Sequence, residues 1–138
     1  MGDDVIDLVG PTRGAVFRAL LAAVPGDLCA VFDDIPQGTE PNYLKIGAID
    51  TEQDDAKADQ FEILTVEVFG VYRGADRGVL VDMRFAGRKA LDRVALPATG
   101  DAQFVRSRFM KGVISDASPQ DGVTYVGLMH FEIWAEPA

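Results

Sequence analysis

The sequence predicts one α+β domain, in which a long helix packs on one face of a mixed, mostly antiparallel sheet. Three observations support this class. The chain has 138 residues, a length that fits a single domain with a real core. Hydrophobic residues make up 48% and charged residues 25%, as is ordinary for a globular protein. Segments with helical spacing and segments with strand alternation follow one another in the order α-β-β-β-α-β-β.

The first helix is expected to begin at Gly10-Pro11-Thr12, because proline fits the first turn of a helix. Its apolar stripe at helical spacing consists of Val16, Ala19, Leu20, Ala23 and Val24. The turn-forming residues 24–27 then end the helix. Residues 1–10 are predicted to form an N-terminal arm, and residues 11–138 the domain.

Three strands are predicted next, at 28–32, 43–49 and 60–72, with polar connections at 33–41 and 51–59. The third strand has one apolar face, made of Leu64, Val66 and Val68, which should enter the core. Its opposite face consists of Phe61, Ile63, Thr65, Glu67 and Phe69. This second face is too apolar for open water, so we expect a partner or another part of the chain to cover it.

The second half of the chain is predicted to contain a helix at about 77–94 and two long strands, 102–114 and 123–134. The apolar stripe of the helix consists of Leu80, Met83, Gly87, Ala90, Leu91 and Val94. Two basic pairs spaced four apart are expected on its outer side: Arg84 with Arg88, and Lys89 with Arg93. The face of the last strand expected in the core consists of Val123, Tyr125, Met129, Phe131, Ile133 and Ala135.

Charge is distributed unevenly along the chain, whose formal net charge is −9. Residues 1–60 carry 12 acidic and 4 basic side chains, whereas residues 73–111 carry 9 basic and 4 acidic ones. These halves can face each other within the fold, meet head to tail between identical copies, or lie on solvated surface without a partner. An acidic protein is a poor candidate for tight binding to nucleic-acid phosphates.

Few residues are suited to catalysis. The single cysteine, Cys29, lies among apolar residues, which favours a small buried side chain over a nucleophile. The single histidine, His130, lies two residues from Glu132, but two ligands make a weak metal site. The doublets Asp33-Asp34 and Asp54-Asp55 fall in loops and match no calcium-loop spacing. We therefore expect no catalytic residue, cofactor or resident metal.

The sequence also gives no sign of a membrane partner. No apolar run reaches the roughly 18 residues that a membrane-spanning helix needs. Asp3, Asp4 and Asp7 stand where a signal peptide would be basic, so none is expected. A single cysteine suits a protein assembled inside a cell.

Two segments resemble a family of small tail-completion proteins of long-tailed bacteriophages, prophages and phage-like gene transfer agents. Residues 31–47 read VFDDIPQGTEPNYLKIG, similar to the family's D-x-P-Q-G…P-Y stretch that leads into I-G. Residues 64–74 read LTVEVFGVYRG, similar to its strand that ends in an aromatic residue and a Y-x-G turn before a long helix. Residues 116–131 resemble its C-terminal strand. The chain departs at Asn42, where the family often has proline or phenylalanine.

The resemblance implies a tail terminator, a virion protein that forms a six-fold ring on the end of the tail tube. Such a ring stops tube polymerisation and joins the tail to the head-tail connector. It is assembled in the host bacterial cytoplasm, and DNA passes through its lumen without specific binding. The residues that we expect at ring or tube interfaces are Asp54, Asp55, Asp59, Phe61, Ile63, Phe69, Arg84 and Arg88. The loop acids would repel DNA phosphates, and the opposite charges would serve contacts between different faces of neighbouring copies.

Two other classes of protein remain open on sequence grounds. One is a homo-oligomeric ligand-binding or regulatory module. The other is an enzyme whose site lies at a subunit interface near His130 and Glu132.

Overall fold

The computed structural model describes residues 7–34, 38–53, 62–118 and 121–138. Its elements follow the predicted order, and the class is confirmed as α+β. They are α1 (Val9–Ala23), β1 (Ala30–Phe32), β2 (Tyr43–Gln53), β3 (Glu62–Arg73), α2 (Gly78–Leu91), β4 (Ala102–Ile114) and β5 (Thr124–Pro137).

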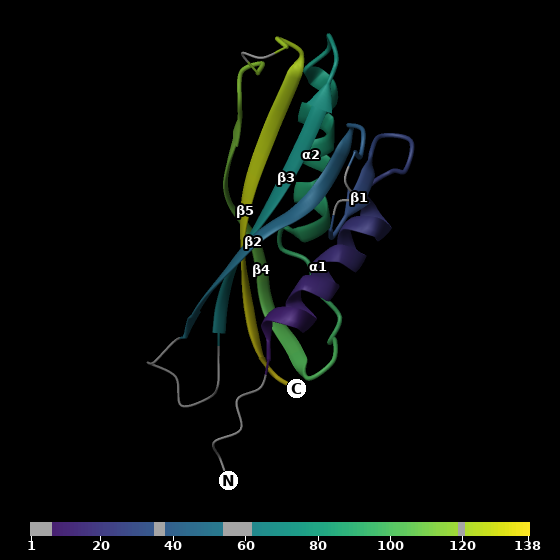
Figure 1. The fold of residues 1–138 in the computed structure, drawn as a ribbon. Coiled ribbons are helices and arrows are strands. Elements are labelled where there is room, and N and C mark those ends of the chain that lie inside the picture. Colours follow the sequence, from purple (N-terminus) through teal and green to yellow (C-terminus); the bar gives the residue numbers. More distant parts are fainter. Residues whose placement is uncertain (1–6, 35–37, 54–61, 119–120) are drawn as a thin grey trace.

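The five strands form one mixed sheet in the order β1-β2-β3-β5-β4 (Figure 1). All neighbours are antiparallel except β1 and β2, which run parallel. Both helices lie on the same face of the sheet: α1 packs on β1 and β2, and α2 on β3, β5 and β4. This face of the sheet is therefore covered by two helices that contact each other, whereas the sequence predicts that one long helix packs on it. The other face of the sheet is not covered by any helix of the described residues.

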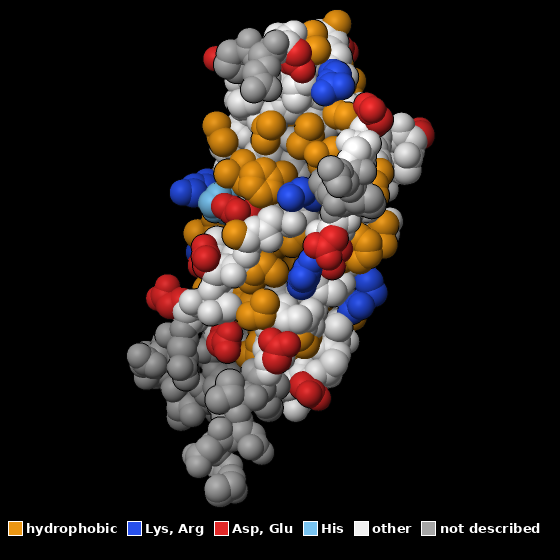
Figure 2. Space-filling view, in the orientation of Figure 1, with side chains coloured by type: hydrophobic (Ala, Val, Ile, Leu, Met, Phe, Trp, Pro, Cys, Tyr) orange, Lys and Arg blue, Asp and Glu red, His pale blue; other side chains and the backbone are white. Residues whose placement is uncertain are grey.

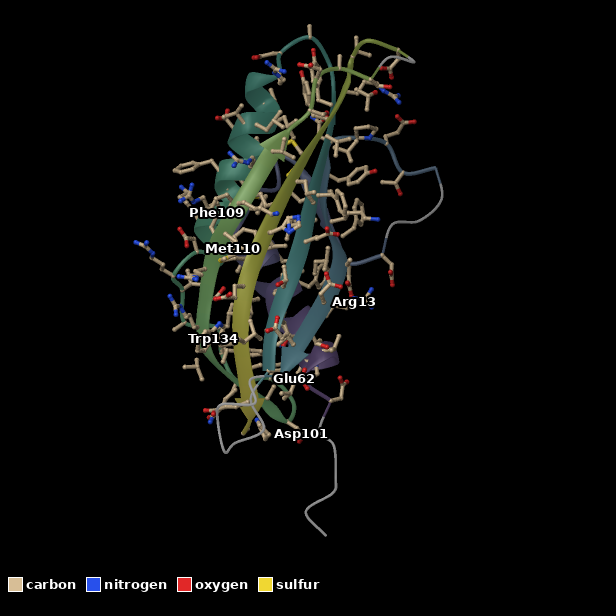
Figure 3. The ribbon with its side chains drawn as sticks, turned by 90° about the vertical axis from the view of Figure 1, so that its left-hand side faces the viewer. Arg13, Glu62, Asp101, Phe109, Met110 and Trp134 are labelled. Carbon is tan, nitrogen blue, oxygen red and sulfur yellow. The ribbon has the colours of Figure 1, made fainter. Side chains whose placement is uncertain are left out.

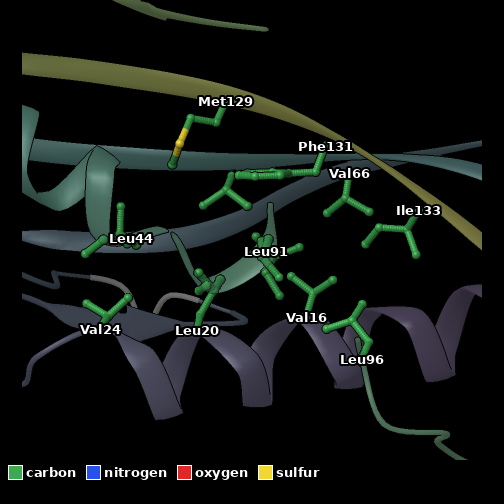
Figure 4. Close-up of a cluster of buried hydrophobic side chains, with 14 of the residues drawn as sticks. Val16, Leu20, Val24, Leu44, Val66, Leu91, Leu96, Met129, Phe131 and Ile133 are labelled. Atoms are coloured by element: carbon green, nitrogen blue, oxygen red, sulfur yellow. The ribbon is translucent and has the colours of Figure 1, made fainter. Parts of the chain in front are cut away.

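The core lies between the two helices and the sheet (Figure 4). Leu64, Val66 and Val68 are completely buried, as predicted from the alternation of β3. Phe131 is the largest fully buried side chain, and it points from β5 toward the helices. Val123 is predicted to share this core face, but it is 39% exposed, because β5 begins only at Thr124.

The helix ends differ from the prediction for identifiable reasons. Helix α1 begins at Val9, inside the range predicted as an arm, where Asp7 Oδ1 accepts hydrogen bonds from the Val9 and Gly10 amides. A carboxylate is favourable at this end of a helix, which carries a partial positive charge. Helix α2 ends at Leu91 because Asp92 adopts an extended backbone, with ψ at 115°. The Leu91 carbonyl, left without a partner in the helix, accepts a hydrogen bond from the buried Ser107 hydroxyl of β4 at 2.5 Å.

Two glycines make room for α2 on the sheet. Gly70 of β3 pairs with Gly127 of β5. A Cβ on Gly70 would lie 3.1 Å from Leu44 Cδ2 and 3.2 Å from Leu80 Cδ1. Leu80, which is completely buried, therefore packs where the paired glycines leave space.

Strand β2 continues to Gln53, beyond the predicted end at residue 49. The polar residues 51–59 are predicted to form a loop, but Thr51, Glu52 and Gln53 pair with β3, and residues 54–59 lie outside the described residues. A bulge between Ile46 and Ile49 interrupts the ladder, so alternation counted from Tyr43 does not extend through the strand.

Candidate assembly interface

The register of the strands arranges the open face of the sheet in cross-strand rows. Two rows, here called the apolar rows, lie toward the start of β2. They consist of Tyr43, Val71 and Val126, and of Lys45, Phe69, Leu128 and Val113. Figure 2 shows hydrophobic side chains gathered over this upper part of the face. Val113 is 59% and Val126 37% exposed, so the rows offer apolar area to a partner.

Three further rows, the charged rows, cover the other half of the open face. They consist of Glu67, His130 and Lys111; of Asp50, Thr65, Glu132 and Arg108; and of Glu52, Ile63, Trp134 and Arg106. Each acidic side chain lies on β2, β3 or β5, and each Lys or Arg lies on β4. The face is thus acidic toward β2 and basic toward β4.

Several side chains of the charged rows are paired within the chain. His130 Nε2 lies 3.6 Å from Glu67 Oε2. Glu132 Oε1 lies 3.3 Å from Arg108 Nε and accepts a hydrogen bond from Trp134 Nε1 at 2.9 Å. Arg106 lies over the Trp134 ring, 5.3 Å from its centroid. These contacts fix the central part of the face.

The predicted pair of His130 and Glu132 does share the open face, but each residue has a different partner. In the described part of the chain, no three His, Cys, Asp or Glu side chains come together as a metal site would require. The two side chains therefore take part in separate contacts on the open face.

Two of the predicted interface residues lie on the open face, and four cannot be placed. Ile63 and Phe69 are half-buried on β3, opposite the helices, as the alternation predicts. Phe69 carries the Lys45 ammonium 5.8 Å from its ring centroid. The other four, Asp54, Asp55, Asp59 and Phe61, lie outside the described residues.

Arg84 and Arg88 lie on the side of α2 that faces β4, where Arg84 is half-buried and Arg88 is exposed. Both guanidinium groups stack on the Phe109 ring of β4, at 5.6 Å and 4.2 Å from its centroid. Arg88 also forms an ion pair with Asp92 at 3.5 Å, and Asp92 Oδ1 accepts a hydrogen bond from the Phe109 amide at 2.9 Å. The two arginines thus bind α2 to β4, because a guanidinium gains more over an aromatic ring than in water.

The edge strand β4 carries two bulges that the sequence does not reveal. Its pairing with β5 skips Val105 and Met110, which turn outward and are 57% and 45% exposed. Bulges on edge strands commonly redirect side chains in this way. Figure 3 shows Met110 and Trp134 along the β4 side of the sheet, with Arg13 on the opposite side.

At the opposite edge of the sheet, Arg13 of α1 forms ion pairs with two aspartates that follow β1. Arg13 Nε lies 2.5 Å from Asp33 Oδ1, and Arg13 Nη2 lies 3.0 Å from Asp34 Oδ1. The Asp33-Asp34 doublet is therefore paired with a helix residue, and Asp34 remains 93% exposed. A hollow of about 660 Å³ beside these residues is also lined by Lys45 and Glu67.

The Cys29 thiol is buried just before β1, and burial raises its pKa to about 11 from an ordinary value of 9.0. A thiol with a raised pKa is a poor nucleophile, in agreement with the expectation that Cys29 is a packing residue.

This pKa shift predicts a loss of stability in alkali. Between pH 9 and about 11 the unfolded chain has lost the Cys29 proton that the native chain retains. Raising the pH through this window therefore lowers the free energy of unfolding. Urea unfolding of wild type and Cys29→Ala across the window should show a steeper decline for wild type. Parallel declines would contradict the assignment, since all other titrating groups are common to both proteins.

No described helix combines the length and the apolar character that crossing a membrane requires.

Comparison with known proteins bears mainly on the fold. No protein-family model matches the chain, and no curated protein matches it. Among solved structures, it is similar to a chain described as "Virion of native gene transfer agent (GTA) particle". The TM-score is 0.83 at 19% identity, and the match covers 96% of this chain and 99% of that one. The two chains share one fold over nearly their whole length.

Proposed function

We propose that this chain is a structural virion protein of a phage-like particle, namely the tail terminator. In this role it forms a hexameric ring on the end of the tail tube, stops tube polymerisation and joins the tail to the head-tail connector. Its partners are further copies of itself, the tail-tube protein and the connector or stopper protein. It is located in the tail or neck of the virion, after assembly in the bacterial cytoplasm.

The observation that carries this proposal is the likeness to a chain of a gene transfer agent virion, which spans 96% of the protein at a TM-score of 0.83. A match of this extent shows that the two chains share one fold over nearly their whole length. The sequence motifs at residues 31–47 and 64–74 resemble the tail-completion family independently of the fold.

The surface of the molecule also suits a non-enzymatic role in assembly. The apolar rows are open in the described structure, and an exposed apolar face commonly marks a contact with another protein. The acidic character of the chain suits a ring through which DNA passes without binding.

Electron microscopy of the purified protein, alone and with the tail-tube protein of the same particle, tests the proposal. We expect six-fold rings, and tubes that are shorter and capped at one end when the protein is present during polymerisation. Native mass spectrometry should give a six-copy species. A strictly monomeric protein that leaves tube length unchanged would rule out the terminator role.

A His130→Ala variant separates this proposal from an enzyme with a site at a subunit interface. The variant removes the imidazole that faces Glu67 but leaves the apolar rows intact. Ring formation and tube capping should be preserved. Loss of an enzymatic activity of the wild type, with ring formation and tube capping intact, would favour the enzyme.

A further inference from the structure

We propose that the β4 edge of one copy docks on the β2 edge of a second copy, and that this head-to-tail contact closes the ring. The inference rests on the proposed function and identifies the surfaces that would form it. The β4 surface is defined by Arg93, Val105, Arg106, Met110 and Lys111. The β2 surface is defined by Asp34, Asp50 and Glu52.

The β4 surface combines exposed apolar side chains with cations. The two bulges place Val105 and Met110 in solvent, next in sequence to Arg106 and Lys111. A hollow of about 400 Å³ beside Val105 is lined by Arg93, Arg106 and Arg108, and no carboxylate of the described residues lines it. Such a hollow suits the acidic side chain of a partner. Apolar centres with arginine around them are typical of protein interfaces.

The β2 surface is acidic and lies at the other edge of the described sheet. Strand β1 pairs only with residues 43–45, so the rest of β2 is an edge in the described part of the chain. Asp50 and Glu52 are exposed there, on the open face, and neither makes an ion pair within the described residues. Asp34 lies beyond the end of β1, where it pairs with Arg13 but is still 93% exposed.

The positions of the two surfaces indicate that each of them contacts a second copy of this chain. They lie on opposite edges of one sheet, separated by β3 and β5. A two-fold contact would need both surfaces within one continuous patch, which their place on opposite edges does not allow, whereas successive copies can pair them head to tail. This repetition closes into a ring when the rotation between copies is suitable. Opposite charges then set the register and exclude contacts between two like edges.

Charge reversal on each edge tests the contact. Arg106→Glu with Lys111→Glu makes both edges acidic, and Asp50→Lys with Glu52→Lys makes both edges basic. We expect each double variant to raise the dissociation constant for self-association at least about tenfold, measured by analytical ultracentrifugation. Asp116→Lys, at the exposed turn after β4, is the control and should assemble like wild type.

Recombination of the variants gives the decisive result. A mixture of the two double variants should form rings in which they alternate, since six copies allow strict alternation. A chain with all four reversals should assemble with itself. If both double variants form rings as wild type does, or if neither combination restores assembly while all variants remain folded by circular dichroism, the proposed contact is wrong. The terminator role fails separately, if wild type forms no ring with or without the tube protein.

Discussion

Phe131→Ala is expected to lower the free energy of unfolding by about 3–5 kcal/mol, a large fraction of the stability of a domain of this size. Phe131 is completely buried between β5 and the helices, and its ring meets the Phe109 ring edge to face at 5.7 Å. Truncation removes the transfer free energy of the ring and leaves a cavity that the surrounding sheet and helices cannot fill. Urea or thermal unfolding of the purified variant measures the effect.

Val126→Ala is the matched control for this prediction. Val126 lies on the same strand but on the open face, where it is 37% exposed. Its truncation should cost less than about 1 kcal/mol, because little buried area is lost and no cavity forms. Equal losses in the two variants would show that the helices do not cover the Phe131 face as described.

Gly70→Val is expected to cost about 1–3 kcal/mol, although valine normally favours strands. The position lies under α2, where even a Cβ would meet Leu44 and Leu80 at 3.1–3.2 Å. The added methyl groups must therefore displace Leu44 or Leu80, or separate α2 from the sheet. Chemical denaturation again measures the loss.

A double-mutant cycle with Leu80→Ala shows whether this clash is the cause. Leu80→Ala alone should cost about 2–5 kcal/mol, because a fully buried leucine is truncated. In the Gly70→Val background the same truncation should cost clearly less, since the valine occupies part of the space that Leu80 leaves. Additive losses would mean that the valine is accommodated elsewhere.

Some of the predicted interface residues could be placed from the sequence alone, and others only from the fold. Ile63 and Phe69 could be placed on the open face because alternation along a single strand assigns them there. Helical spacing alone could not predict that Arg84 and Arg88 pack on Phe109, which lies over twenty residues farther along the chain. Likewise, no local sequence pattern predicts that Val105 and Met110 fall in bulges.

Local periodicity was enough to determine the class of the fold, the order of its elements and the core faces of β3 and β5. These properties depend on neighbours within a few residues, and burial of an apolar face requires the same alternation wherever the strand lies. Only the tertiary structure decided that both helices share one face, that Gly70 and Gly127 form a pair, and that acidic and basic side chains separate toward opposite edges. Strand order and register arise from contacts between distant segments, which a single sequence does not encode at any fixed spacing.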